Sequence, residues 1–180
     1  MIQFPYSQES KEYSCNLCCI ANLLYLTEEE YSYELSEIEK KEELQERLLN
    51  EYTENLILKR YRPNWYFNTI YRIPPCRGEI INCSECFTEN NIENRGKGFY
   101  KIFLLSVQLH SLHRILAIKE IDSDKLFIID SIKEYTWLLD IRVVFDRYQV
   151  KGISVLRDLS SNIKEVALPY EALKHLIPAI

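Results

Sequence analysis

The chain has 180 residues, with 22 basic and 27 acidic side chains and a formal net charge of −5 at pH 7. This negative balance argues against nucleic acid as the main partner, because binding to nucleic acid depends on clustered basic side chains. Since 47% of the residues are hydrophobic, the chain can bury a real core, and we expect residues 1–180 to form a single domain.

The sequence opens without a basic stretch followed by an apolar run, and no apolar run approaches the roughly 20 residues of a membrane-spanning helix. We therefore expect no signal peptide, no membrane span and a cytoplasmic location. Thiols stay reduced in the cytoplasm, so the six cysteines are expected to be free. The sequence gives no indication of the oligomeric state.

The first predicted element is a buried helix over residues 15–26. Its apolar side chains recur at helical spacing, and no glycine or proline interrupts them. They are Leu17, Ile20, Leu23 and Leu24. A second helix is predicted to begin at Thr27, which forms a capping box with Glu30, and to run, with a break near Ser36, to about Leu58.

Residues 59–98 are predicted to be an irregular insertion within the domain. Proline, glycine and asparagine interrupt this segment, which contains one extended apolar and aromatic piece, Trp65 to Ile73. Beyond it the pattern changes to short runs rich in Ile, Val, Leu and Phe, which are typical of strands.

The predicted strands are Phe99–Leu109, Arg114–Ile121, Lys125–Ile129, one within Tyr135–Val144, and Ile153–Leu156. A last helix is predicted over Tyr170–Leu176, after Pro169. Helices followed by a largely antiparallel sheet indicate the α+β class.

Cys15 lies at the junction between a polar, turn-prone segment and the first apolar helix. A thiol at a helix N-terminus lies near the positive end of the helix dipole and near unpaired N–H groups, and both favour the nucleophilic thiolate. Gln8, seven residues upstream, can supply an amide N–H to a developing oxyanion. A nucleophilic cysteine also needs a base and a group that orients the base.

His113 and Asp130 are the candidate base and orienting group. His113 begins one predicted strand, and Asp130 ends the next strand. With a turn centred on Asp122 and Ser123, His113 lies opposite Ile132. Asp130 is then its diagonal neighbour on the same face, whereas a shift of one residue would separate the two. The predicted chemistry is attack by cysteine, proton transfer through histidine and orientation of the imidazole by the carboxylate.

These residues carry a resemblance to a known family. The run Ser14-Cys15-Asn16-Leu17-Cys18-Cys19-Ile20-Ala21-Asn22-Leu23 resembles the active-site helix of the papain-like peptidases that cut double-glycine leaders in bacteriocin exporters. The resemblance covers about residues 8–26 and 110–131. The resemblance implies that Cys15 is the nucleophile, Cys19 the second cysteine of the helix and His113 the base. It also implies that Asp130 orients the base and that Gln8 is the oxyanion-hole glutamine.

The chain departs from the family pattern in three places. Asn16 stands where the family has glycine, Asp130 is not followed by the common proline, and Gln8 lies one residue further from the cysteine. Cys18 is a second candidate nucleophile, because Cys15-x-x-Cys18 also resembles the papain spacing. We favour Cys15, which lies nearer Gln8 and at the junction itself.

The resemblance implies a papain-like α+β fold, with the helix of residues 15–26 packed on a C-terminal antiparallel sheet. It also implies a thiol-dependent acyl-transfer enzyme, first of all a cysteine peptidase that acts on a protein or peptide. A glutamine deamidase or an acyltransferase on the same fold is the alternative, as is a catalytically inactive binding module.

The other cysteines raise the question of a metal. Cys76, Cys83 and Cys86 form a Cys-x-x-Cys with a third cysteine upstream, but a structural zinc site needs four ligands, and only His110 offers a fourth. A thioredoxin-type reading of Cys15-x-x-Cys18 fails because the preceding residues are too polar for a strand. The glycines form no phosphate-binding loop. We expect no cofactor and no metal.

Overall fold

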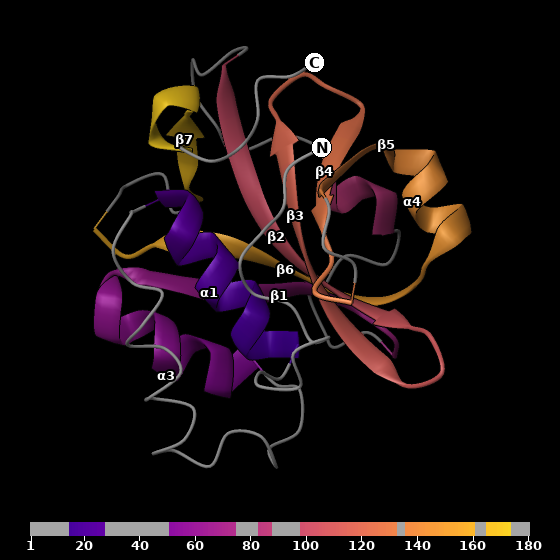
Figure 1. Cartoon of the computed structure of the whole chain (residues 1–180), viewed down its shortest axis with the longest axis horizontal. Coiled ribbons are helices and arrows are strands. Elements are labelled where there is room, and N and C mark those ends of the chain that lie inside the picture. The colour runs from indigo at the N-terminus through magenta and orange to yellow at the C-terminus, as the bar shows by residue number, and fades with distance from the viewer. Residues whose placement is uncertain are drawn as a thin grey trace.

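The computed structural model of the chain describes residues 15–27, 51–74, 83–87, 98–132, 136–160 and 165–173. Within these residues, the helices α1 (Cys15–Thr27), α3 (Glu51–Tyr61) and α4 (Ile141–Arg147) lie around a seven-stranded sheet (Figure 1). The predicted α+β class is confirmed. No helix in this described part combines the length and the apolar character needed to cross a membrane.

The sheet follows the order β1-β6-β2-β3-β4-β5, with β7 paired to β2, and the pairs are antiparallel. Its strands are β1 (Trp65–Arg72), β2 (Phe99–Gln108), β3 (Leu112–Glu120), β4 (Lys125–Ile129), β5 (Thr136–Asp140), β6 (Gln149–Asp158) and β7 (Ala167–Pro169). The hairpin β3–β4, predicted to carry two site residues, therefore lies inside the sheet and not at its edge.

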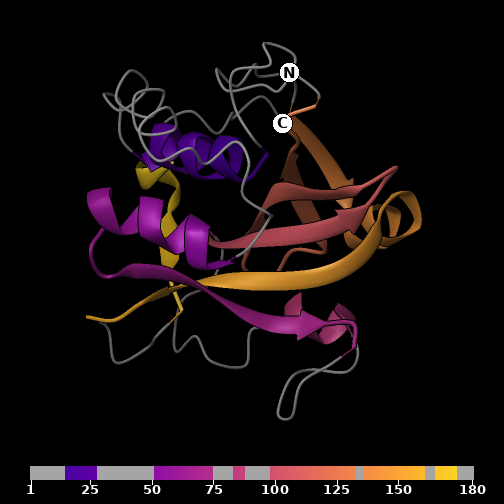
Figure 2. The same cartoon turned by 90° about the horizontal axis from the view of Figure 1, so that it is seen from below.

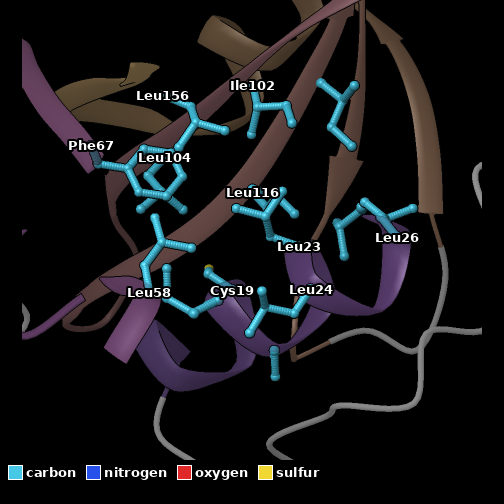
Figure 3. Packing of buried hydrophobic residues seen from close by; sticks show 14 of the residues in the cluster. Cys19, Leu23, Leu24, Leu26, Leu58, Phe67, Ile102, Leu104, Leu116 and Leu156 are labelled. Atoms are coloured by element: carbon cyan, nitrogen blue, oxygen red, sulfur yellow. The ribbon is translucent and has the colours of Figure 1, made fainter. Parts of the chain in front are cut away.

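The first apolar core lies between the sheet and the helices α1 and α3, which Figure 2 shows on the same side. Burial of apolar side chains on this face supplies the main driving force for docking the helices. Figure 3 shows the contact between α1 and the strands. The fully buried members of the first core include Leu23, Leu24, Leu26, Leu58, Phe67, Ile102, Leu104, Leu116 and Leu156.

The second core covers the opposite face of the sheet, where side chains of alternate strand positions point. The helix α4, which Figure 1 shows beside β4 and β5, and the 3-10 turn Cys83–Phe87 pack there. Phe103, Ile115 and Ile128 are among its fully buried residues. The sheet is thus buried on both faces, which explains the nearly continuous apolar runs of β2 and β3.

Part of the segment predicted as an irregular insertion belongs to the sheet. Trp65–Arg72 forms the edge strand β1, paired with β6. Phe67 is fully buried against the first core. Its backbone N–H donates to Asn55 Oδ1 at 2.7 Å, and the Asn55 amide donates back to its carbonyl oxygen at 2.9 Å. The strand is fixed by these contacts from α3, which the local pattern does not reveal.

Two predicted helices differ in detail from the structure. Thr27 ends α1, and its hydroxyl donates to the Leu23 carbonyl oxygen at 3.1 Å. Glu30, the other residue of the predicted capping box, and the predicted break near Ser36 lie outside the described residues, so the cap stays a prediction. The predicted last helix begins as a 3-10 turn, Tyr170–Ala172.

The region expected to hold one strand, Tyr135–Val144, holds the strand β5 and then most of a helix. Asp140 ends β5 and caps α4, since its Oδ1 accepts from the Arg142 backbone N–H at 3.0 Å. A side-chain acceptor at this position satisfies one of the unpaired N–H groups of the first turn. The helix ends after Arg147, and its C-cap is Tyr148.

Candidate active site

Cys15 is the first residue of α1 and 7% exposed. The helix begins there because apolar residues follow at helical spacing and pack on the sheet. Cys18 and Cys19, one turn later, are 0% and 2% exposed. The Cys19 thiol donates to the Arg114 carbonyl oxygen on β3 at 3.4 Å. The four described free cysteines, these three and Cys86, are all buried.

The predicted register of the hairpin β3–β4 is confirmed. Leu116 pairs with Ile129 and Lys119 with Leu126, which is the alignment produced by a turn centred on Asp122 and Ser123. Asp122 adopts a left-handed φ of 67° in that turn, a conformation that aspartate tolerates better than most residues.

This register brings His113 and Asp130 together. The His113 Nε2 lies 2.7 Å from Asp130 Oδ1, and both residues are nearly fully buried, 4% and 3% exposed. The Ile132 backbone N–H donates to the same carboxylate oxygen at 3.1 Å. Because Nε2 is engaged with Asp130, the other ring nitrogen, Nδ1, is left for a second partner.

Cys15 is a second hydrogen-bond partner of the same ring. Burial lowers the pKa of His113, but hydrogen bonds with Asp130 and Cys15, together with the negative charge of each partner, raise the pKa to about 9. The imidazole is therefore protonated at neutral pH and lies between a carboxylate and a thiol. A buried imidazolium beside a sulfur atom can stabilise the thiolate, which is the reactive form of cysteine.

Asp130 is held in its ionised form. Burial alone would raise its pKa, but the hydrogen bond to His113, the His113 charge and donors from Ile132 and Tyr148 lower the pKa below its ordinary value. The Tyr148 hydroxyl donates to Asp130 Oδ2 at 3.3 Å. The carboxylate is thus contacted on both oxygens.

A buried ion pair lies next to the site along the chain. Arg114 donates from Nε to Glu54 Oε2 at 2.8 Å and from Nη2 to Glu54 Oε1 at 2.7 Å, a bidentate contact between β3 and α3. Its Nη1 donates to Ser106 Oγ at 2.7 Å, and Nη2 also approaches Ser154 Oγ at 3.3 Å. His113 and Arg114 point to opposite faces of β3, so this network anchors the strand that carries the histidine.

The remaining candidate residues from the sequence are Gln8 and the proposed zinc ligands. Gln8 and Cys76 lie outside the described residues. Cys83 begins the 3-10 turn, Cys86 is buried in the second core, and His110 is exposed. In the part of the chain that the structure describes, no group of three or more histidine, cysteine or acidic side chains is arranged to hold a metal.

Sequence reasoning missed Tyr148 and the Arg114–Glu54 pair. Tyr148 follows α4, which is too short to show a helical repeat of apolar residues in the sequence. The one local indication of this helix was Asp140, a residue type that often caps helices. The signal for the ion pair was Arg114 directly before the apolar run of a strand, because a buried arginine needs an acidic partner.

The chain has no match among known protein families, curated proteins or solved structures.

Proposed function

We propose that this protein is a thiol-dependent acyl-transfer enzyme with a papain-like fold, and specifically a cysteine peptidase. One observation carries the proposal: the His113 imidazole is hydrogen-bonded to Asp130 and interacts with Cys15 as well. The three residues come from α1, from β3 and from the residue after β4, far apart in the sequence. Nucleophile, base and orienting carboxylate in contact form the arrangement that such chemistry requires.

In the proposed reaction Cys15 is the nucleophile, and His113 acts first as an acid and then as a base. The Cys15 sulfur attacks the carbonyl carbon of a peptide bond, and the negative charge moves to the carbonyl oxygen. As the C–N bond breaks, the His113 imidazolium gives its proton to the leaving amine, and a thioester to Cys15 remains. Water then attacks the thioester while His113 takes its proton, which releases the acid and restores the thiolate.

The surroundings of Cys15 support its assignment as nucleophile over Cys18. Cys15 is the first residue of α1, at the positive end of the helix dipole, which favours an anion there. Cys18 is completely buried within the first core, and a substrate carbonyl would have no access to its sulfur. The proposal also takes a protein or peptide as substrate, a cytoplasmic location, and no metal or cofactor in the reaction.

The test is an electrophilic peptide probe for active cysteines, followed by profiling of new protein N-termini after addition of the enzyme to a proteome. Wild-type protein and the Cys18→Ala variant should react with the probe and generate the same cleavages. Cys15→Ala and His113→Ala should do neither.

Other outcomes of this experiment would change the proposal. Conversion of glutamine to glutamate without cleavage would assign a deamidase, and a new acyl group on an acceptor would assign an acyltransferase. Absence of any probe reaction in folded wild-type protein would contradict a catalytic role and favour a binding module on the same fold.

A further inference from the structure

The Asp130 carboxylate is contacted by donors from three different parts of the fold. His113 on β3 and the Ile132 backbone N–H both lie at Oδ1, at 2.7 Å and 3.1 Å. The Tyr148 hydroxyl, from the residue that follows α4, lies at Oδ2 at 3.3 Å. Contacts on both oxygens restrict rotation of the carboxylate about its own axis, and the position of Oδ1 decides where the His113 ring points.

Tyr148 is itself firmly placed. It is 4% exposed and packs in the second core, and its backbone N–H donates to the Val144 carbonyl oxygen at 2.9 Å, closing the end of α4. A buried hydroxyl needs a partner, and Asp130 supplies it. Burial, and then the charge of Asp130, raise the pKa of Tyr148 to about 12 against a smaller opposing effect of Arg147. The hydroxyl therefore remains a donor at neutral pH.

We propose that Tyr148 is a positioning residue of the site: its hydroxyl locks the Asp130 carboxylate and thereby keeps the His113 imidazole aimed at Cys15. This inference rests on the proposed function, but the contact itself can be tested without any turnover. Through Tyr148, the residue that follows α4, this helix contributes to the position of the site residues.

The direct test is Tyr148→Phe, which keeps the ring in the second core and removes only the hydroxyl. The carboxyl group loses one donor, so the Asp130 pKa should rise in a carbon-13 NMR titration of the folded protein. Among the described residues, the titratable groups in contact with this carboxylate are His113 and Tyr148, so His113 must be followed in the same titration. Turnover, if present, should fall about 10-fold in kcat with KM nearly unchanged, because the loss concerns orientation and not substrate binding.

Tyr100→Phe is the matched control. Tyr100 is also buried, 8% exposed, but it packs in the first core on the other face of the sheet. This change should leave the Asp130 pKa and kcat unaltered. An unshifted Asp130 pKa in Tyr148→Phe, with a loss of stability like that of Tyr100→Phe, would show that Tyr148 has only a packing role and would overturn the inference.

A second measurement does not depend on folding of the Tyr148 variant. In Asp130→Asn the charge that faces the phenol is absent, so the Tyr148 pKa should fall from about 12 toward the ordinary value of tyrosine. An unchanged value, followed by ultraviolet absorbance, would contradict the contact. If wild-type protein cleaves no substrate, the proposed function fails, while the two titrations still decide whether Tyr148 holds Asp130.

Discussion

At the scale of single residues, the central feature is a charged pair buried at the end of the hairpin β3–β4. His113 and Asp130 are each less than 5% exposed, and burial of a charge is costly unless it is paired and hydrogen-bonded. Here each residue supplies the opposite charge to the other, and the Ile132 N–H and the Tyr148 hydroxyl satisfy the carboxylate further. The site is therefore stable as a unit, and removal of one member disturbs the rest.

The first prediction concerns Asp130→Asn. The amide keeps the shape of the side chain but removes its charge, so the imidazolium of His113 is less stabilised and less well oriented. Turnover should fall by about 10²–10⁴-fold, a smaller loss than that of Cys15→Ala, because Asp130 makes no bond to substrate. Steady-state kinetics on both variants provide the comparison, and equal turnover of Asp130→Asn and wild type would exclude the orienting role.

The second prediction concerns the dependence of stability on pH. The pKa of His113 is raised from 6.5 to about 9 in the folded protein, so its stabilising contribution is complete below 6.5 and is lost as pH rises through 9. The contribution corresponds to on the order of 3 kcal/mol. Urea unfolding should show a fall in the free energy of unfolding across this range for wild type and a much smaller fall for His113→Gln. Identical pH dependence in the two proteins would refute the assignment.

The third prediction concerns Gln8, which lies outside the described residues and whose role stays a prediction from sequence. If its amide donates to the oxyanion, Gln8→Ala should lower kcat by about 10²–10³-fold. KM should change little, because the charge exists only in the transition state. A kcat close to that of wild type would mean that other donors, such as the Cys15 backbone N–H, form the oxyanion hole.

At the scale of elements, the contact between α3 and β3 depends on the Arg114–Glu54 ion pair. Glu54 is 0% and Arg114 5% exposed, so loss of one partner leaves an uncompensated charge in the core. The fourth prediction is that Glu54→Leu lowers the free energy of unfolding by about 3–5 kcal/mol, whereas the double variant Glu54→Leu/Arg114→Met recovers most of the loss. Urea titration measures both, and the exposed Glu171→Leu serves as a surface control. Additive losses in the double variant would contradict a paired role.

Two elements that build the site could be predicted from sequence. The helix α1 was predicted because its apolar residues repeat without interruption, and its observed bounds, Cys15–Thr27, differ from the prediction by one residue. The hairpin β3–β4 was predicted because a polar two-residue turn separates two apolar runs, and that turn fixes the register. Since register decides which side chains share a face, the pairing of His113 with Asp130 followed from sequence as well.

Other elements could be predicted only in part or not at all, because contacts distant in sequence determine them. An extended piece was predicted at Trp65 to Ile73, but its place as the edge strand β1 depends on contacts with α3 and β6. The helix α4 has only seven residues, too few for a clear helical period, so Tyr148 was missed with it. The partner of Arg114 lies 60 positions away, in a helix whose local pattern shows Glu54 only as one acidic residue among several.

At the scale of the whole molecule, packing in the two cores fixes the positions of the residues that form the site. The first core fixes α1 against β3, so it sets the place of Cys15, and the second core fixes α4, so it sets the place of Tyr148. The site lies where the N-terminus of α1 meets the hairpin β3–β4. We therefore predict that Cys15 differs in reactivity from the other buried cysteines only while the fold is intact and His113 is present.

The most direct measurement of that claim is alkylation by iodoacetamide at about pH 6–7, where few ordinary thiols are ionised, with the rate at each cysteine followed by mass spectrometry. Wild-type protein should be modified at Cys15 about 10-fold or more faster than at Cys18, Cys19 or Cys86, and His113→Ala should abolish this difference. Uniformly slow modification of wild type, or faster modification of Cys18 than of Cys15, would contradict the account.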